Sequence, residues 1–407
     1  MNEAARPHTA QLAMVEADSA RLPSAQIAAP RINSSVRIPA LDGLRGIAIL
    51  LVLNWHSVAR TTFLHHPTVT RILGIERLTW SGVDLFFVLS GFLIGGILLD
   101  HRDSPNYFRT FYLRRAYRIL PLYFLVVTLC WVVFQLSNRG WTPYGRIDLF
   151  PGTLPWWSFF TFTQNLVVAV VGGSSRGGLG VTWSLAIEEQ FYLTLPFVIR
   201  RVSRKSLGYI LVAIICVVPI LRGLLIHYWA GGAGAAYVLT PCRADTLAMG
   251  VLCALLVRSE RAWNYLIAHR SWLNWALGTF GICVVAMIVK EVPFYNRALY
   301  GLEFSVMALF YGAVLMVAVI GDNRFFRRVL CNPLLMKLGI IAYGTYLFHY
   351  IFIDTARFVL TYHREHASAW AFIGADVLGI ALAIGAAILS WRYFEKPLVQ
   401  RGHAYNF

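Results

Sequence analysis

An arginine and a histidine mark the two ends of one apolar stretch, residues 41–57 (LDGLRGIAILLVLNWHS). Arg45 and His56 are eleven positions apart. A helix therefore carries both side chains on nearly the same face, roughly 16 Å apart along its axis. A histidine on an apolar helix is either a packing residue held by a hydrogen bond or a functional residue. Inside a bilayer the functional interpretation is favoured, because ionisable side chains are costly there and usually face a cavity, a substrate or a partner. A neutral imidazole can take a proton from a hydroxyl near pH 7, so His56 is the predicted general base.

Basic residues gather in 111–121 (FYLRRAYRILP), where an apolar run begins. Arginines commonly anchor the cytoplasmic end of a membrane span, and that role alone accounts for Arg114. Arg115 and Arg118 are one helical turn apart and share a face, where two guanidinium groups can hold phosphate oxygens bidentately. Together with Arg45, at the same expected membrane level, they predict a pocket for an anionic ligand that carries phosphate.

Two adjacent carboxylates, Glu188 and Glu189, lie near the start of the next candidate helix, in residues 181–192 (VTWSLAIEEQFY). Adjacent helical residues point about 100° apart, so at most one of them faces the centre of a cavity. Glu188 follows Ser184 by one turn and is the preferred candidate. It either orients and charge-stabilises His56 or forms an ion pair with a helix arginine.

Further residues are supporting candidates. Asp84, in GVDLFFVLSGFL, falls early in an apolar run and needs a partner there, which is either structural or functional. Arg243 and Asp245, in PCRADTLAMG, either form an interfacial pair or line an acceptor site. His349, in YGTYLFHY, is titratable and inside an apolar run like His56, but it ranks behind His56 as a catalytic group.

Apolar runs of membrane-spanning length must position these side chains. Of the 407 residues, 57% are hydrophobic and 14% are charged, and the mean hydropathy is +0.59, which excludes an ordinary water-soluble domain. Each run is close to the roughly 20 residues that a bilayer core requires of a helix. We predict an all-α, polytopic integral membrane protein with about ten transmembrane helices. The predicted spans are 42–61, 81–99, 117–136, 183–200, 207–228, 238–257, 272–290, 299–320, 338–360 and 369–391.

The segments outside these spans complete the predicted organisation. Residues 1–38 have neither an apolar stripe nor a signal-peptide core, which predicts a disordered cytoplasmic tail. A single transmembrane domain follows over 39–398, and 399–407 form a short C-terminal tail. Residues 154–171 are aromatic and apolar but contain Gln164 and Asn165, which favours a short interfacial or re-entrant piece over a further span.

Charge and cysteine usage narrow the function classes. Lysine and arginine gather on one side of the predicted spans, so the positive-inside rule places both termini in the cytoplasm. The formal charge of +16 then reflects topology, and nucleic acid is not an expected partner. The six cysteines include no C-x-x-C pair, so neither a disulfide framework nor a metal site is expected.

Six motifs occur in an order that is typical of one membrane family. They are LDGLRGIAILLVLNWH, GVDLFFVLSGFLI, FYLRRAYRILP, WSLAIEEQFY, RADTLAMG and YGTYLFHY. From about residue 38 to about residue 398 the chain resembles the acyltransferase family 3 proteins, which include O-antigen, exopolysaccharide, nodulation-factor and macrolide acyltransferases. The family's first-helix signature falls on Arg45 and His56. Its paired arginines fall on Arg115 and Arg118, and its fourth-helix glutamate falls on Glu188.

The resemblance implies transfer of an acetyl or other short acyl group from cytoplasmic acyl-CoA to a hydroxyl, commonly on a carbohydrate. We therefore expect acetyl-CoA as the donor substrate and no permanently bound cofactor. The expected partners are a carbohydrate or lipid-linked glycan acceptor and membrane lipids, and the expected location is a bacterial inner membrane. In this hypothesis Arg45, Arg115 and Arg118 bind the CoA phosphates. His56 is the general base and Glu188 orients or stabilises it. The sequence leaves open whether the acyl group passes through a covalent enzyme intermediate.

A multi-pass transporter or exporter is the alternative function from another class. Many helices with buried His, Glu and Asp side chains also suit a proton-coupled carrier. Transporters commonly contain two related halves with interrupted helices, and the sequence contains no such repeat. A structural or sensory membrane protein is disfavoured by the number of ionisable residues inside the spans.

Overall fold

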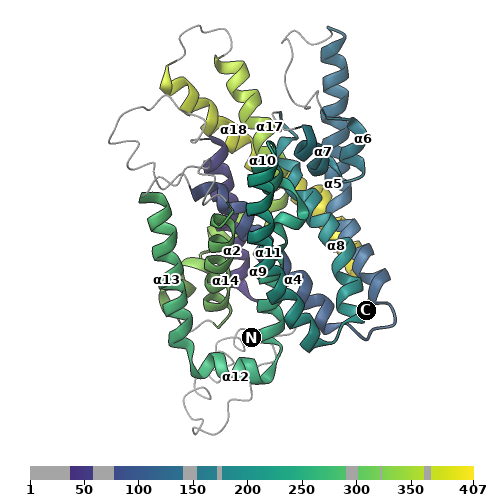
Figure 1. The fold of residues 1–407 in the computed structure, drawn as a ribbon. Coiled ribbons are helices and arrows are strands. Elements are labelled where there is room, and N and C mark those ends of the chain that lie inside the picture. Colours follow the sequence, from purple (N-terminus) through teal and green to yellow (C-terminus); the bar gives the residue numbers. More distant parts are fainter. Residues whose placement is uncertain are drawn as a thin grey trace, which may run out of the picture.

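The computed structural model describes residues 37–57, 78–140, 154–171, 177–289, 301–320, 323–361 and 368–407. All regular secondary structure in these residues is helical (Figure 1). The longer helices are α2 (Pro39–Ser57), α4 (Gly82–Asp100), α5 (Tyr107–Asn138), α8 (Trp183–Arg201), α9 (Arg204–Tyr228), α11 (Thr240–Val257), α13 (Arg270–Val289), α14 (Glu303–Ile320), α17 (Ala342–Thr361) and α18 (Ala369–Ser390). The shorter ones are α6 (Trp156–Phe160), α7 (Gln164–Val171), η3 (Gly180–Thr182), α10 (Gly232–Val238), α12 (Glu260–Ala268), α15 (Arg324–Leu330), α16 (Pro333–Ile340), the π-helical turn η4 (Trp391–Glu395) and α19 (Lys396–His403).

A long helix occupies each of the ten predicted spans, with ends that differ by several residues. By length and apolarity, seven helices of the described chain can cross a membrane, or eight if the bent pair α16 and α17 forms one span. Helices α2 and α8 are not among them. Polar residues at both ends of α2, and Glu188, Glu189 and Gln190 in α8, lower their hydropathy. The count of ten stays a prediction, as does the location of the termini, and residues 1–36 of the predicted tail lie outside the described residues.

Helix α4 lies inside the bundle and is buried along most of its length. Glycines let it approach α11 closely. A Cβ on Gly91 would lie 2.1 Å from the carbonyl oxygen of Leu247, and a Cβ on Gly250 would lie 2.1 Å from that of Val88. Small residues at such a crossing permit tight backbone packing between membrane helices. This contact fixes the orientation of α4 and of Ser90 on its other side.

Helix α2 is held in the same way by α16. A Cβ on Gly46 would lie 2.2 Å from the carbonyl oxygen of Leu335, and one on Gly339 would lie 1.9 Å from that of Asp42. Helix α16 packs closely against α2. After α16 the chain bends by 77° into α17. The prediction of one continuous span over 338–360 is therefore wrong at its start.

Residues 154–171 form two short helices, α6 and α7, of 5 and 8 residues. This agrees with the predicted short piece, because neither helix is long enough to cross a bilayer core. Gln164 Nε2 donates to the hydroxyl of Tyr123 (3.1 Å) and to the carbonyl oxygen of Thr182 (2.9 Å). Asn165 donates to a carbonyl oxygen at the end of α10 (3.1 Å). The polar side chains that argued against a span therefore attach this segment to the bundle.

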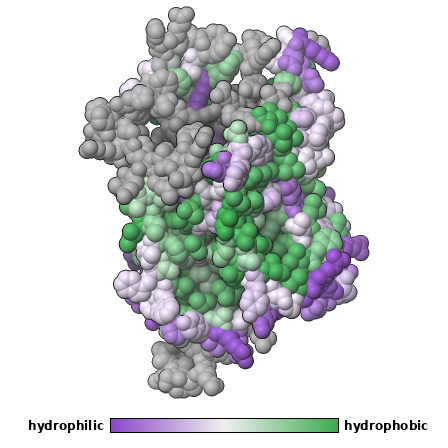
Figure 2. All heavy atoms as spheres, viewed as in Figure 1, coloured by the Kyte–Doolittle hydropathy of each residue, from purple (hydrophilic) through white to green (hydrophobic). Residues whose placement is uncertain are grey.

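The exposed apolar side chains of the outer surface are typical of a membrane protein. Figure 2 shows apolar side chains over the middle of the face in view and hydrophilic ones at its lower edge, near α12. On α13, Trp272 and Trp275 are 64% and 76% exposed. Exposed apolar surface of this extent needs a cover, and acyl chains provide it for a multi-pass membrane protein.

The predicted C-terminal tail, 399–407, packs against α5. Arg114 donates from Nε (2.9 Å) and from Nη2 (2.6 Å) to the carbonyl oxygen of Tyr405. Thr110 donates to the carbonyl oxygen of Asn406 (2.7 Å). These contacts occupy Arg114, which agrees with its separation from the phosphate-binding candidates in the sequence.

Candidate active site

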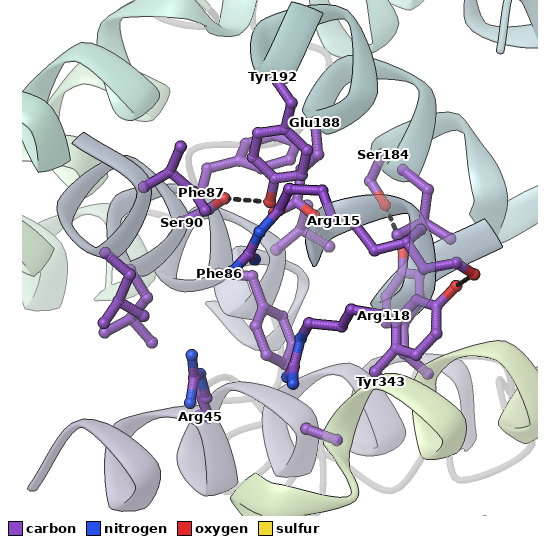
Figure 3. Close-up of a pocket in the computed structure, with 18 of the residues that line it drawn as sticks. Arg45, Phe86, Phe87, Ser90, Arg115, Arg118, Ser184, Glu188, Tyr192 and Tyr343 are labelled. Carbon is purple, nitrogen blue, oxygen red and sulfur yellow. Dashed lines mark hydrogen bonds between the residues drawn. The ribbon is translucent and has the colours of Figure 1, made fainter. Parts of the chain in front are cut away.

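A cavity opens between α2, α4, α5, α8 and α17 and encloses about 870 Å³ when its mouth is counted (Figure 3). Its polar lining residues are Arg45, Ser90, Arg115, Arg118, Ser184, Glu188, Tyr192, Tyr343 and Tyr346. Its apolar lining includes Phe86, Phe87, Leu93 and Ile94. The predicted arginines and the predicted glutamate therefore meet in one place. Within the described ranges, no three His, Cys, Asp or Glu side chains lie close enough together to hold a metal ion.

Arg45 enters the cavity from α2. Its Nη1 donates to Asp42 Oδ1 (3.0 Å), and Arg37 donates to the other oxygen of the same carboxylate (2.9 Å). The shared carboxylate holds the Arg45 guanidinium near the mouth of the cavity, and 29% of the side chain stays exposed. A cation held in this way is available to a ligand that enters from the same side.

Arg115 and Arg118 enter from one face of α5, as the sequence spacing predicted. Figure 3 shows their guanidinium groups and that of Arg45 pointing toward the same space. The charge of Arg118 acts on both Arg45 and Arg115. Among the residues that the structure describes, neither Arg115 nor Arg118 makes an ion pair within 4.0 Å. Like charges gathered in a partly buried cavity repel one another, so the arrangement favours a polyanionic ligand.

Glu188 belongs to this cavity. The hydroxyls of Ser90 and Tyr192, which line the cavity beside Glu188, lie 2.5 Å apart. The charges of Arg115 and Arg45 act on Glu188. Glu188 lines the cavity together with the arginines and His56 does not, which favours a carboxylate that balances the arginine charges over one that orients His56.

His56 lies deeper, beyond the residues that line the cavity. Its Nδ1 is 2.9 Å from the carbonyl oxygen of Val52 and 3.2 Å from Nε2 of His349. His349 in turn places Nδ1 2.7 Å from the carbonyl oxygen of Tyr346. Because Tyr346 lines the cavity, this chain of contacts connects the cavity to His56.

Comparison with known proteins decides the family. A family model described as an acyltransferase domain matches residues 38–392. The chain belongs to acyltransferase family 3. It is 31% identical over 387 residues to a Bacillus subtilis protein named provisionally as a peptidoglycan O-acetyltransferase. It is 29% identical over 385 residues to a peptidoglycan O-acetyltransferase of Listeria monocytogenes, and 26% identical over 380 residues to a Staphylococcus aureus protein named provisionally as an O-acetyltransferase.

The alignments with these three relatives cover 90% of this acyltransferase chain. They cover only 55%, 56% and 58% of the Bacillus, Listeria and Staphylococcus proteins, so the chain spans little more than half their length. No solved structure matches it.

Two buried ion pairs lie elsewhere in the acyltransferase bundle. Arg243 Nη2 donates to Asp84 Oδ1 (2.6 Å), and both side chains are fully buried. Asp245 instead binds Arg222 through both carboxylate oxygens (3.0 and 2.7 Å). The prediction that Arg243 and Asp245 pair at an interface is wrong, because residues two apart on a helix point in nearly opposite directions. Arg222 was missed, although an arginine within the apolar run 207–228 was the signal for it.

Aromatic rings surround the Arg243 guanidinium. Its Cζ lies 4.2 Å from the centre of the Phe304 ring and 5.7 Å from that of Tyr237. Asp84 is therefore its counter-charge in a buried region between α4, α10, α11 and α14. These contacts show how Arg243 and Asp245 are paired and do not test the acceptor-site alternative, which stays a prediction.

We expect Asp84→Ala to lower the melting temperature of the detergent-purified protein by at least about 5 °C. Removing one partner of a buried ion pair leaves the other charge uncompensated, at a cost of about 3–5 kcal/mol. Arg37→Ala is the matched control, because its ion-pair side chain is 68% exposed and such pairs contribute little. Equal melting temperatures for Asp84→Ala and Arg37→Ala would contradict the structural role of Asp84.

Proposed function

We propose that the protein transfers an acetyl or other short acyl group from cytoplasmic acyl-CoA to a hydroxyl of a carbohydrate or lipid-linked glycan, in a bacterial inner membrane. The observation that carries the proposal is the convergence of Arg45, Arg115 and Arg118 on one cavity. CoA joins several phosphates to a long, uncharged arm that ends in the thioester. The cavity combines these arginines with apolar walls that include Phe86 and Leu93, so both parts of the donor find suitable partners.

The spacing along α2 supports the same donor. Arg45 and His56 are separated by roughly 16 Å along a helix, a length that an extended pantetheine arm can cover. The inner end of the cavity carries Ser184 and Tyr346, whose hydroxyl oxygens lie 2.5 Å apart. An acyl group at this end is next to the contacts that lead through His349 to His56.

The proposed reaction has two steps. The acceptor hydroxyl gives its proton to His56 and its oxygen forms the new ester bond with the acyl carbon. The carbon–sulfur bond of the thioester breaks, and the CoA thiolate takes the proton back from the imidazolium. Glu188 balances the arginine charges in the donor cavity and takes no part in the proton transfer.

The named relatives support a carbohydrate acceptor. Two of the proteins described above carry names that specify peptidoglycan, a polymer of aminosugars with free hydroxyls. The proposal keeps the acceptor class at carbohydrate hydroxyls, which includes surface polysaccharides and glycolipids.

Membrane vesicles with the protein, supplied with radiolabelled acetyl-CoA and purified cell-wall glycans, test the proposal. We expect label to enter the glycan as an ester that mild alkali releases, since alkali cleaves O-acetyl esters and leaves amides intact. Vesicles without the protein are the control. The result that overturns the proposal is label that stays on CoA with every glycan acceptor while an unmodified glycan crosses the vesicle membrane, as a carrier requires.

A further inference from the structure

Two histidine rings meet beyond the donor cavity, His56 of α2 and His349 of α17. Nε2 of His349 lies 3.2 Å from Nδ1 of His56, and the ring centroids are 4.9 Å apart. His349 is fully buried, and Tyr350 packs edge-on against His56 at 5.3 Å. The contact joins two residues that are 293 positions apart in the chain, so it is a product of the fold.

Hydrogen bonds to the backbone determine which nitrogen of each ring carries a hydrogen. Nδ1 of His349 is 2.7 Å from the carbonyl oxygen of Tyr346, and Nδ1 of His56 is 2.9 Å from that of Val52. A carbonyl oxygen only accepts, so both Nδ1 atoms carry hydrogen. A neutral imidazole has one N–H, which makes Nε2 the basic nitrogen of each ring. The one hydrogen on Nδ1 of His56 is therefore shared between the carbonyl oxygen of Val52 (2.9 Å) and Nε2 of His349 (3.2 Å), which both accept from it.

We propose that His349 is a positioning residue that holds His56 with its hydrogen on Nδ1 and its basic Nε2 turned to the acceptor hydroxyl. This inference rests on the proposed function, in which His56 is the general base. When His56 takes up the acceptor proton, its Nδ1–H becomes a charged donor and His349 Nε2 accepts from it. A carboxylate commonly fills this place behind a catalytic histidine. Here an imidazole fills it. His349 stays neutral when His56 is charged, because two imidazolium rings with nitrogen atoms 3.2 Å apart would repel each other.

The position of His349 is itself fixed from α8. Tyr346, one turn before it, donates from its hydroxyl to the carbonyl oxygen of Val181 (2.8 Å) and lies 2.5 Å from the hydroxyl oxygen of Ser184. Because Tyr346 and Ser184 line the donor cavity, the same contacts that shape its inner end also hold the histidine pair. Donor binding and the orientation of the base thus depend on one rigid connection between α8 and α17.

Three substitutions at His349 test the proposal. In His349→Gln the side-chain amide reaches about as far as Nε2 and can accept from His56. In His349→Asn the amide reaches only about as far as Nδ1, and in His349→Met an apolar side chain of similar length replaces the ring. We expect His349→Asn and His349→Met to lower kcat at least about tenfold, and by no more than the loss at His56, which is about 10²–10⁴-fold for a general base. His349→Gln should keep most of kcat, and all three should leave the KM for acetyl-CoA within about twofold of wild type.

A double substitution separates positioning from simple packing. If His349 acts through His56, His349→Met should add no further loss to His56→Ala, because effects of groups that act as a unit are not additive. Melting temperature and elution volume in detergent show whether each variant is folded. Should His349→Met unfold, the comparison of His349→Gln with His349→Asn still decides.

The outcomes distinguish this inference from the proposed function. Wild-type kcat in His349→Asn, or an equal fall in His349→Gln and His349→Asn, overturns the positioning role while an inactive His56→Ala leaves the proposed function intact. Wild-type transfer by His56→Ala overturns the proposed function itself.

Discussion

His56→Ala is expected to lower acyl transfer by about 10²–10⁴-fold and to leave acetyl-CoA affinity unchanged. The substitution removes the only group that the proposed reaction uses to take the proton of the acceptor hydroxyl. Affinity should not change, because the arginines proposed to bind the donor line the cavity and His56 does not. Arg45, the one on α2, is roughly 16 Å from His56 along that helix. The measurements are the rate of base-labile label entering the glycan and the dissociation constant of acetyl-CoA.

His269→Ala is the matched control for this substitution. His269 follows α12 and places Nδ1 3.0 Å from the carbonyl oxygen of Tyr265, the same backbone contact that His56 makes with Val52. It lies outside the cavity and the histidine pair, so its loss should leave transfer at the wild-type rate. Should His56→Ala lose acetyl-CoA affinity as much as rate, the histidine belongs to donor binding and the assignment of a general base fails.

Much of the lining of the cavity between α2, α4, α5, α8 and α17 could be predicted from the sequence, because its polar residues follow helix periodicity. Arg115 and Arg118 are one turn apart, and α5 presents both on one face. Arg45 and Glu188 reach the same space from α2 and α8. The residue spacing within one helix predicts which side chains share a face. Residues of different helices that lie at the same expected depth in the membrane are then expected to be close to one another.

The contacts between helices could not be predicted in this way. His56 meets His349, and Asp84 meets Arg243, across 293 and 159 positions of sequence. Nothing in the sequence of α2 indicates that the partner of His56 is an imidazole of α17. From the sequence, that role was therefore assigned to Glu188, a carboxylate in another predicted span. Close helix packing decides such partners, and it depends on glycines whose role is visible only when the opposing backbone is in place.

The bend before α17 has the same origin. The apolar sequence of 338–360 predicts one helix. In the structure Gly339 belongs to α16, where it packs against the backbone of Asp42 in α2. That contact holds α16 against α2, and α17 starts after a 77° turn. Because α17 starts after this turn, its His349 comes to lie against His56.

Arg115→Ala and Arg118→Ala should each raise the dissociation constant of acetyl-CoA about 10- to 100-fold. A hydrogen bond to a charged group contributes about 1.5–3 kcal/mol, and neither arginine has a competing ion pair in the part of the chain that the structure describes. Lysine at either position should recover only part of the affinity, because a point charge cannot bind two phosphate oxygens as the guanidinium fork does. Binding should also weaken as salt is added, since the mouth of the cavity is open to solvent.

Arg114→Lys and a donor without phosphates make this prediction specific. Arg114 precedes Arg115 directly, but its guanidinium binds the carbonyl oxygen of Tyr405, so its replacement should leave acetyl-CoA affinity unchanged. Acetyl-pantetheine carries the same thioester and arm without the phosphates of CoA. If the arginines bind phosphate, their removal weakens acetyl-CoA alone and leaves the KM for acetyl-pantetheine as it is. An equal loss for both donors would mean that Arg115 and Arg118 shape the cavity and do not bind phosphate, because only acetyl-CoA has phosphates to lose.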